Sequence, residues 1–408
     1  MGNVHGVARP SRLVSGATAF ALSILFIVVY ALTGWITSLR ADVGTWAFDW
    51  ERRLPFVPWL IAPYMSLDLF FVAAPFLCRS RAELGVFTRR MSTAILAAGA
   101  MFLVMPLRFA FPRPVPVGWT KEIFQLLYGF DRPCNLFPSL HIAILIILAG
   151  TYHRHTRGLP RWLMHGWFTL IGMSTVLTYQ HHVIDMVGGL ALGTLCCYLV
   201  ADRSTRQPVT LNARIGVWYA IGAAILATAG IWLRPWGLAL LWPAASATLV
   251  AGAYFGLSGH ITRKEDGRLP LAARIVLGPW LAGQQVSLFY YRRDAAAWNA
   301  VASDIWIGRQ LNDREAAGAV REGVAAVLDL TGPAPEQVRA AIEFINAYRR
   351  DGVVYVHCKI GYSRSAAIVG SWLIDSGLAA TPDEAVSRLR AARPSVVACA
   401  KAKCDMSR

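Results

Sequence analysis

Cysteine is scarce in this sequence, and its spacing fits neither cross-linking nor metal binding. The 408 residues include seven cysteines, an odd number, and they form no metal-ligand pattern. A disulfide framework is therefore not expected, and we predict no metal ion and no other cofactor. The sequence also lacks internal repeats and low-complexity tracts, so we interpret the whole chain as ordinary folded domains.

Acidic residues are few as well. The chain has 24 Asp and Glu against 40 Lys and Arg, which gives a formal net charge of +16. Such an excess would suggest nucleic acid or acidic lipid as a partner if it were clustered in one patch or tail. Here the basic residues are mostly scattered through short loops between apolar runs, the pattern by which membrane proteins set their topology. Nucleic-acid binding is therefore excluded from the expected functions.

Apolar residues, in contrast, are abundant. They make up 55% of the chain, although the last third has an ordinary composition. We therefore predict an α-helical polytopic membrane bundle followed by one soluble domain. Runs long enough to cross a bilayer predict about eight transmembrane helices. These lie near residues 16–38, 57–78, 91–111, 137–152, 162–180, 183–201, 215–233 and 236–257.

The first apolar run, roughly residues 17–36, has some features of a signal peptide. It is long, lacks a small-residue cleavage site and precedes further spans, so we interpret it as a retained helix. The loops richest in Lys and Arg fall on one side of the bundle, which places both termini in the cytoplasm. The prediction is an integral, multi-pass protein of a bacterial inner membrane. Its parts are a membrane domain at 1–260, a linker at 261–298 and a soluble domain at 299–408.

The soluble part alternates strands and helices, which indicates an α/β domain with a central sheet. Strands are predicted at 304–308, 324–330 and 353–356, and helices at 312–322, 335–350, 365–376 and from Thr381 onward. Asn312 and Thr381 are the expected caps of two of these helices. The segment 270–298 is too polar for a ninth span, and we predict an amphipathic segment at the membrane interface.

Ionisable residues stand where predicted membrane helices begin, which is costly and indicates a functional site. His181 and Asp185 are four residues apart at one helix start, so the carboxylate can orient the imidazole. His141 begins another helix on the same, outer side and is a candidate acid. A histidine oriented in this way can attack phosphorus and form a phosphohistidine. Arg108 and Arg113, on the segment leading in, can bind phosphate oxygens.

These residues resemble the motifs of the type-2 phosphatidic acid phosphatase superfamily, over a core of roughly residues 90–205. The matching positions are Arg113-Pro114, Pro138-Ser139-Leu140-His141 and the set Ser174, His181 and Asp185. The resemblance implies that His181 is the nucleophile, Asp185 its orienting partner and His141 the acid and base. It also adds Ser139 to the phosphate-binding residues.

Three positions depart from the motifs. Leu140 replaces a Gly of the second motif, Pro106 stands where the first has Lys, and Thr175 stands where the third has Arg. Two phosphate-binding cations are therefore missing or displaced. Such departures resemble the branch that contains inositol phosphorylceramide synthases and sphingomyelin synthases, which transfer a phospho-headgroup between lipids. Membrane lipids are the expected substrates, and water and a lipid hydroxyl both remain open as the acceptor.

A second site lies in the soluble domain, where Cys358 falls between a predicted strand and a predicted helix. Backbone amides and the helix N-terminus stabilise a thiolate at such a place, and the same amides form a nest for a phosphate dianion. Arg364 adds a bidentate clamp. Gly361 permits the tight turn, Ser363 lies on the phosphate loop, and Ser365 can donate a hydrogen bond to the sulfur.

The run from His357 to Ser365 resembles the signature of cysteine-based phosphatases, and residues from 299 to about 400 resemble a dual-specificity protein phosphatase domain. The resemblance implies that Cys358 forms a phosphocysteine, that Arg364 binds phosphate and that an upstream aspartate is the acid. Asp329 stands 29 residues before Cys358, about where the family keeps that acid. The domain, however, is some 20 to 30 residues short of the family pattern. Asp329 therefore has a second interpretation, as the end of an earlier strand.

The prediction is a bifunctional membrane phosphatase, with a lipid phosphatase or phosphotransferase outside and a cysteine phosphatase inside. A phosphoprotein or a phosphoinositide is the expected partner of the inner site. Two other interpretations remain. In the first, the C-terminal domain senses phosphate without turnover and regulates a headgroup transferase. In the second, the membrane part is a transporter, for which Asp68 is the one good mid-bilayer ionisable residue.

Overall fold

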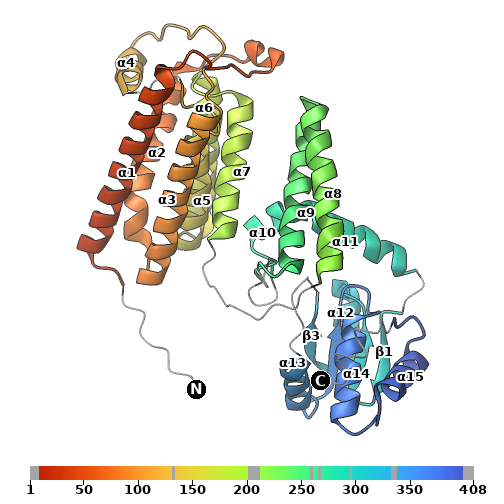
Figure 1. Cartoon of the computed structure of the whole chain (residues 1–408). Coiled ribbons are helices and arrows are strands. Elements are labelled where there is room, and N and C mark those ends of the chain that lie inside the picture. Colours follow the sequence, from red (N-terminus) through yellow and green to blue (C-terminus); the bar gives the residue numbers. More distant parts are fainter. Residues whose placement is uncertain are drawn as a thin grey trace. The chain divides into compact units, whose positions relative to one another are not determined.

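The computed structural model describes residues 9–130, 134–200, 212–257, 261–264, 268–293, 296–331 and 338–397. The chain divides into two compact units, Met1–Ser204 and Thr205–Arg408. Figure 1 colours the first from red to yellow-green and the second from green to blue. Each unit is described by itself below.

The first unit is a bundle of helices (Figure 1). Its elements are α1 (Arg12–Ser38), η1 (Asp49–Arg53), η2 (Pro58–Leu60), α2 (Ile61–Leu77), α3 (Arg81–Val104), α4 (Thr120–Phe130), α5 (Leu140–His155), α6 (Gly158–Leu177) and α7 (Val183–Leu199). Six of them correspond to the first six predicted helices. The short helix α4 was not predicted. It packs Phe124 into a cluster with Ile61 and Tyr64 of α2.

All eight apolar runs form helices, but their ability to cross a membrane differs. Four helices of the described residues have the required length and composition: Arg12–Ser38, Pro58–Leu77, Ala213–Trp232 and Trp236–Tyr254. Helix α7 is apolar but shorter. Helix α3 begins well before the predicted start, because Ser80 caps it by accepting a hydrogen bond from the Glu83 amide (3.0 Å). The total of eight spans therefore stays a prediction.

Glycine brings α7 against α5. A Cβ on Gly189 would lie 2.4 Å from the carbonyl oxygen of Ser139, so only a residue without a side chain permits this approach. The Ser139 amide also donates to the carbonyl of Asp185 (3.0 Å). The start of α5, which carries His141, is therefore joined to the start of α7, which carries Asp185.

The second unit combines helices with one small sheet (Figure 1). Its elements are α8 (Ala213–Trp232), η3 (Trp236–Leu240), α9 (Leu241–Tyr254), α10 (Leu271–Val276), α11 (Gly278–Tyr291), β1 (Trp298–Ala302), β2 (Ile305–Gly308), α12 (Asp313–Arg321), β3 (Val324–Asp329), α13 (Val338–Tyr348), β4 (Val353–His357), α14 (Arg364–Asp375) and α15 (Pro382–Ala392). Helices α8 and α9 match the last two predicted spans, while α10 and α11 lie within the predicted linker.

The sheet has the strand order β1-β2-β4-β3. Strands β1 and β2 are antiparallel, whereas β2, β4 and β3 run parallel. His357 at the end of β4 is in register with Gly308 of β2 and Asp329 of β3. The carboxyl ends of three strands therefore meet at one edge of the sheet, which is where open α/β sheets place ligand sites.

Most strands and helices of the C-terminal α/β domain could be predicted from the sequence. Asn312 caps α12 in a capping box with Glu315, and Thr381 caps α15. The predicted strands correspond to β2, β3 and β4, and the apolar face of α14, including the fully buried Trp372, packs on them. Strand β1 was not predicted. The first residues of the predicted helix 335–350 fall outside the described residues, and α13 is described from Val338.

Candidate functional site

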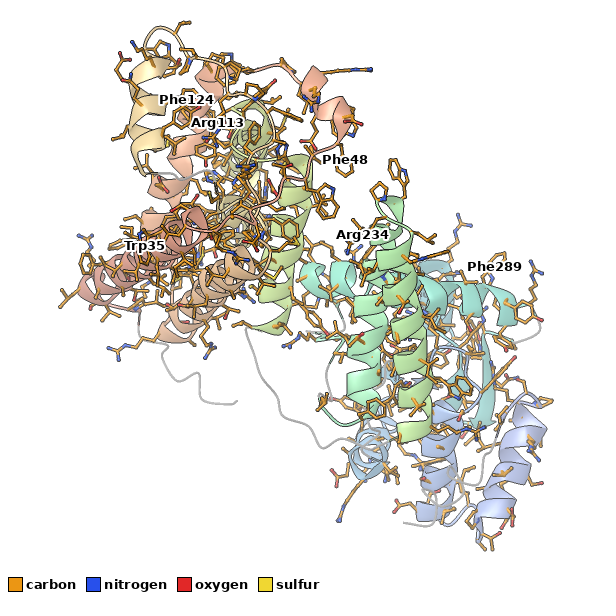
Figure 2. The ribbon with its side chains drawn as sticks, turned by 45° about the horizontal axis from the view of Figure 1, so that its top comes forward. Trp35, Phe48, Arg113, Phe124, Arg234 and Phe289 are labelled. Carbon is orange, nitrogen blue, oxygen red and sulfur yellow. The ribbon has the colours of Figure 1, made fainter. Side chains whose placement is uncertain are left out.

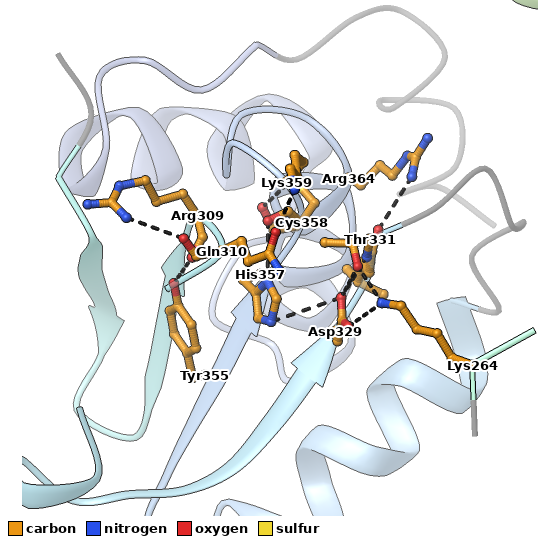
Figure 3. Close-up of polar contacts among 12 residues, drawn as sticks. Lys264, Arg309, Gln310, Asp329, Thr331, Tyr355, His357, Cys358, Lys359 and Arg364 are labelled. Atoms are coloured by element: carbon orange, nitrogen blue, oxygen red, sulfur yellow. Dashed lines mark hydrogen bonds and ion pairs between the residues drawn. The ribbon is translucent and has the colours of Figure 1, made fainter. Parts of the chain in front are cut away.

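Cys358 lies between the end of β4 and the start of α14, at the edge of the sheet where the strands end (Figure 3). Gly361 turns the loop back with a φ of +83°, and a Cβ there would lie 2.5 Å from the backbone of Gly308. Both features require glycine. The turn directs the Gly361 amide at the Cys358 sulfur, at 3.2 Å. The loop therefore has the predicted form.

The environment of Cys358 favours its thiolate. Burial would raise the pKa of the thiol, but the Ser365 hydroxyl and the amides of Ser365, Gly361 and Ile360 outweigh it and lower the pKa below its usual value. The Ser365 oxygen lies 3.5 Å from the sulfur and is fully buried. Hydrogen bonds of this kind stabilise the charged form of the side chain and make a cysteine nucleophilic at neutral pH.

Arg364 is the first residue of α14 and lies beside the same loop. Its Nη1 donates to the carbonyl of Leu330 (3.4 Å), and its Nη2 donates to the hydroxyl of Tyr254 (3.2 Å). Ser363, at the cap position of α14, is exposed. The structure thus brings Cys358, Gly361 and Ser365 into contact and places Arg364 and Ser363 next to them.

Asp329 ends β3, the strand hydrogen-bonded directly to β4. Its carboxylate accepts hydrogen bonds from the Thr331 amide (2.8 Å), the Thr331 hydroxyl (2.6 Å) and Lys264 Nζ (2.5 Å). Burial would raise its pKa, but the hydrogen bonds from Lys264 and Thr331 and the charge of His357 lower it. An ionised carboxylate cannot donate a proton. The position agrees with the earlier-strand interpretation, so the acid role of Asp329 stays a prediction that the geometry disfavours.

Two further side chains complete the rim of this site (Figure 3). Lys359 Nζ donates to Gln310 Oε1 (2.7 Å) in the loop after β2, and burial lowers the pKa of this lysine. His357 Nε2 lies 4.0 Å from Asp329 Oδ1, and burial lowers the pKa of the imidazole. Sequence reasoning did not assign Gln310 or Lys264 to the site, because both come from distant segments and neither belongs to a motif.

The first unit contains a cavity of about 520 Å³, a volume typical of small-molecule sites. Its walls come from α1, α2, α4 and α5, and they are mostly apolar. His141, His181, Asn135 and Asp68 supply polar groups to the lining. The cavity thus brings together the two histidines that were predicted to act on one substrate, and it includes Asp68.

His141 and His181 both have ring nitrogens that no protein group satisfies. His141 Nε2 and His181 Nδ1 are buried and lack a hydrogen-bond partner. His181 Nδ1 is 3.6 Å from Asp185 Oδ2, which is longer than a hydrogen bond. Asp185 is almost fully buried, and its Oδ2 accepts the His182 amide (2.8 Å). The predicted pair is therefore adjacent, but the orienting hydrogen bond is not formed.

The predicted phosphate-binding residues of this unit differ in their surroundings. The Arg113 guanidinium lies 5.5 Å from the Phe109 ring centre and 5.0 Å from that of Tyr128 in α4, and its Nε and Nη2 have no hydrogen-bond acceptor. Figure 2 labels Arg113 and Phe124 at the same end of the unit. Arg108 is exposed. Ser139 is fully buried and its hydroxyl accepts the Ile142 amide (3.4 Å), so it caps α5.

The side chains of Ser174 and Thr175, at the third motif, form hydrogen bonds within their own helix, α6. The Thr175 hydroxyl donates to the carbonyl of Gly172 (2.7 Å), and the Ser174 hydroxyl donates to that of Ile171 (2.5 Å). Thr175 therefore does not replace the missing cation.

Sequence reasoning also missed Glu51, which is buried and accepts hydrogen bonds from His182 Nδ1 (3.0 Å) and the Val183 amide (3.1 Å). A second missed residue is Tyr64, whose ring stacks on His141 with the centres 4.2 Å apart. The described residues contain no group of three or more His, Cys, Asp or Glu that could hold a metal ion.

Comparison with known families identifies one part of the chain. Residues 329–404 match the dual specificity phosphatase catalytic domain, which confirms the expectation of a cysteine-based phosphatase for this segment. No curated protein matches the chain.

Among solved structures, PTPMT1 in complex with PI(5)P is 16% identical, with 27% of this chain and 92% of that chain covered and a TM-score of 0.26. Tk-PTP in its active form is 18% identical, covering 27% and 94%, with a TM-score of 0.25. Human DUSP28 is 22% identical, covering 28% and 91%, with a TM-score of 0.24. The likeness in each case is confined to little more than a quarter of this chain.

Proposed function

We propose that the chain is a membrane enzyme with two phosphatase sites of different chemistry. The C-terminal domain hydrolyses phosphate monoesters through a phosphocysteine. The first unit removes or transfers the phosphate group of a lipid through a phosphohistidine. Both termini lie in the cytoplasm, and the membrane is the inner membrane of a bacterium.

The geometry of the Cys358 loop is the observation that supports a phosphocysteine mechanism in the C-terminal domain. The sulfur accepts the Gly361 amide and lies against Ser365, with a lowered pKa. In the proposed reaction the thiolate attacks phosphorus, the P–O bond of the ester breaks and the leaving oxygen takes a proton from solvent water. Water then attacks the phosphocysteine, releases phosphate and returns the thiolate. Arg364 stabilises the charge on the phosphate oxygens in both steps.

The cavity of the first unit supports the second half. Its walls are mostly apolar, as an acyl chain requires, while His141 and His181 supply ring nitrogens without protein partners. The unsatisfied Nε and Nη2 of Arg113 add donors for a phosphate oxygen. A buried polar atom left unpaired is costly. We therefore assign these atoms to the substrate, with His181 as nucleophile, Asp185 as its orienting partner and His141 as acid and base.

Phosphate release and headgroup transfer can be measured together in the purified full-length protein in vesicles. The substrates are labelled phosphatidate and phosphatidylinositol, and the variants are His181→Ala and Cys358→Ser. We expect His181→Ala to lower turnover of phosphatidate at the lipid site by at least a hundredfold. Label that moves to a second lipid would make the site a transferase. If neither variant changed any rate, both catalytic assignments would be wrong.

A second candidate function for the C-terminal domain is phosphate sensing without turnover. The lowered pKa of Asp329 favours it, because no other carboxylic acid of the described residues is assigned to the leaving group. Cys358→Ser separates the two. A catalytic domain would lose turnover and trap its substrate, whereas a sensor would retain its effect on the lipid site.

A further inference from the structure

Arg364, the proposed phosphate-binding residue of the C-terminal domain, has one hydrogen-bond partner outside that domain. Arg364 bonds Leu330 at the end of the sheet and also Tyr254, the last residue of α9 (3.4 and 3.2 Å). The two residues are 110 positions apart in the chain. A helix that precedes the phosphatase domain thus supplies a direct partner to its phosphate-binding arginine.

The segment after α9 makes a second contact with the site. Lys264 Nζ donates to Asp329 Oδ2 and to the Thr331 hydroxyl, each at 2.5 Å (Figure 3). Strand β3, which carries Asp329, is the last in the sheet order. Figure 3 shows Lys264 on the side of Asp329 that faces away from Cys358. Lys264 also places a cation close to where a phosphate dianion would bind.

The position of the Tyr254 side chain is fixed by contacts with neighbouring helices. Its ring stacks on Tyr219 of α8 with the centres 5.9 Å apart, and the Tyr219 hydroxyl accepts a hydrogen bond from Trp280 of α11 (3.2 Å). At its other end, α11 places the Tyr291 ring 5.8 Å from that of Tyr362 in the phosphate loop. Two helices outside the domain therefore contact adjacent parts of the phosphate loop.

Both helices have the features of membrane-associated segments. Tyr254 is the last residue of the candidate span Trp236–Tyr254, and tyrosine at the end of a span belongs at the membrane interface. Helix α11 buries none of its residues and exposes Val286, Phe289 and Tyr290, while Arg292 and Arg293 follow it at positions suited to anionic headgroups.

We propose that Tyr254 and Lys264 belong to the phosphatase site and that this site takes phosphate monoesters carried by membrane lipids. The inference rests on the proposed function, because it requires α9 to cross the membrane and Cys358 to turn over phosphate. Tyr254 is a positioning residue that holds Arg364 for the phosphate oxygens. Lys264 adds positive charge at the side of the site and hydrogen-bonds the Asp329 carboxylate.

The observations favour a lipid over a soluble phosphoprotein. A span that ends within a hydrogen bond of Arg364 fixes the phosphate loop at the level of the lipid headgroups. A phosphate on a headgroup is already at that level, and its acyl chains stay in the bilayer. A phosphotyrosine would instead need its whole protein to dock against the membrane surface.

The test uses the full-length His181→Ala protein in vesicles, so that the lipid site of the first unit is silent. Cys358-dependent phosphate release is the difference from the His181→Ala/Cys358→Ser protein. The probes are phosphatidylinositol monophosphate and phosphatidate in the vesicles, the deacylated soluble form of each, a phosphotyrosine peptide and p-nitrophenyl phosphate. We expect kcat/KM to be at least a hundredfold higher for one of the lipids than for its deacylated form and for the peptide.

The site residues are tested in the same background. We expect Tyr254→Phe, which keeps the stacked ring, and Lys264→Gln each to lower kcat/KM on the lipid about tenfold or more. Vanadate, which mimics the transition state, should bind more weakly to Tyr254→Phe, while alkylation of Cys358 by iodoacetamide keeps its rate. The matched controls are Tyr348→Phe and Arg268→Gln, because both residues are exposed and neither belongs to the site, and they should stay within twofold of the parent.

Three outcomes would overturn the inference. The first is equal or better turnover of the deacylated forms or the peptide, which would assign the site to soluble substrates. The second is an effect of Tyr254→Phe and Lys264→Gln no larger than that of their controls. In both cases Cys358-dependent release from p-nitrophenyl phosphate would leave the phosphatase assignment standing. The third is no Cys358-dependent release from any probe, which would remove the proposed function itself.

Discussion

Ser365 is the side chain on which the reactivity of Cys358 most directly depends. Its hydroxyl is one of the groups that lower the thiol pKa, and a hydrogen bond to a charged group is worth about 1.5–3 kcal/mol, or about one to two pH units. We expect Ser365→Ala to raise the pKa of Cys358 by about one unit or more. Less thiolate is then present at neutral pH, and the acidic limb of kcat/KM moves to higher pH.

The rate of alkylation by iodoacetamide, measured against pH, reports this pKa without requiring a substrate. Ser376→Ala is a suitable control, because Ser376 is an exposed residue at the far end of the same helix. It should leave the alkylation profile unchanged. An unchanged profile in Ser365→Ala would mean that the backbone amides alone set the thiol pKa.

Glu51 offers a second prediction at the scale of one residue. It joins η1 to the start of α7 through His182 and Val183, and its side chain is 2% exposed. Glu51→Ala would leave three donors without their acceptor, namely His182 Nδ1 and the amides of Val183 and Phe48. We therefore expect a loss of stability of about 1–3 kcal/mol or more. The measurement is thermal unfolding in detergent. Asp49→Ala changes an exposed carboxylate on the same turn and should have little effect.

The residues of the candidate sites differ in how far the sequence could predict them. Cys358 and Arg364 could be found because their chemistry depends on local spacing between a strand and a helix. Glu51 could not, because its partner His182 is 131 positions away and nothing near it in the sequence indicates burial. Tyr254 at the end of a span is typical of an interfacial aromatic, so its contact with the phosphate loop requires the fold.

At the scale of elements, the close approach of α5 and α7 decides whether the lipid site can form. Gly189 faces the Ser139 carbonyl, where an added Cβ would lie 2.4 Å from the oxygen. We expect Gly189→Ala to cost about 1–3 kcal/mol through overpacking. It should also lower phosphatidate turnover, because α7 carries Asp185 and would move away from His141.

Gly150 provides the matched control within α5. A Cβ there would meet nothing within 4 Å, so Gly150→Ala should be neutral or stabilise the protein by about 0.5–1 kcal/mol, the usual gain for Gly to Ala in a helix. Thermal unfolding and phosphatidate turnover are measured for both variants. Equal behaviour of the two would contradict the packing account.

Two helix starts in the C-terminal domain could be predicted to the residue, whereas one strand was missed. Asn312 and Thr381 mark the starts of α12 and α15 by side-chain caps. Strand β1 is a short piece, WNAVA, and no Gly or Pro marks its turn into β2. The strand that Asp329 ends could not be assigned from the sequence, because the shortened domain offers one candidate strand where the family pattern has two. The pairing of β3 with β4 places Asp329 at the end of the earlier strand.

At the scale of the whole molecule, hydropathy and packing divide the chain differently. The apolar runs group α8 and α9 with the earlier helices, and the predicted membrane domain therefore ends near residue 260. The packing places them with the phosphatase domain, since the two compact units are Met1–Ser204 and Thr205–Arg408. Hydropathy reports which solvent a helix prefers, whereas packing depends on which side chains meet. A sequence pattern therefore predicts the solvent preference of a helix, but it predicts only part of its packing.

Two sites of different chemistry in one chain should be inactivated independently. Iodoacetamide near neutral pH should react first with Cys358, whose thiol pKa is lowered, because the thiolate is the reactive form. We expect the alkylated wild-type protein to release phosphate from phosphatidate at the rate of untreated Cys358→Ser, because the histidine site of the first unit contains no thiol among its assigned residues. Alkylated His181→Ala should release none.

The Cys358→Ser protein controls for reaction at other cysteines, because iodoacetamide should not change its rate further. Complete loss of phosphatidate turnover in the alkylated wild-type protein, with Cys358→Ser still active, would mean that the bulky adduct at one site stops the other. The activities of the two sites would then be coupled. Full retention in alkylated His181→Ala would instead place all turnover outside both assigned sites.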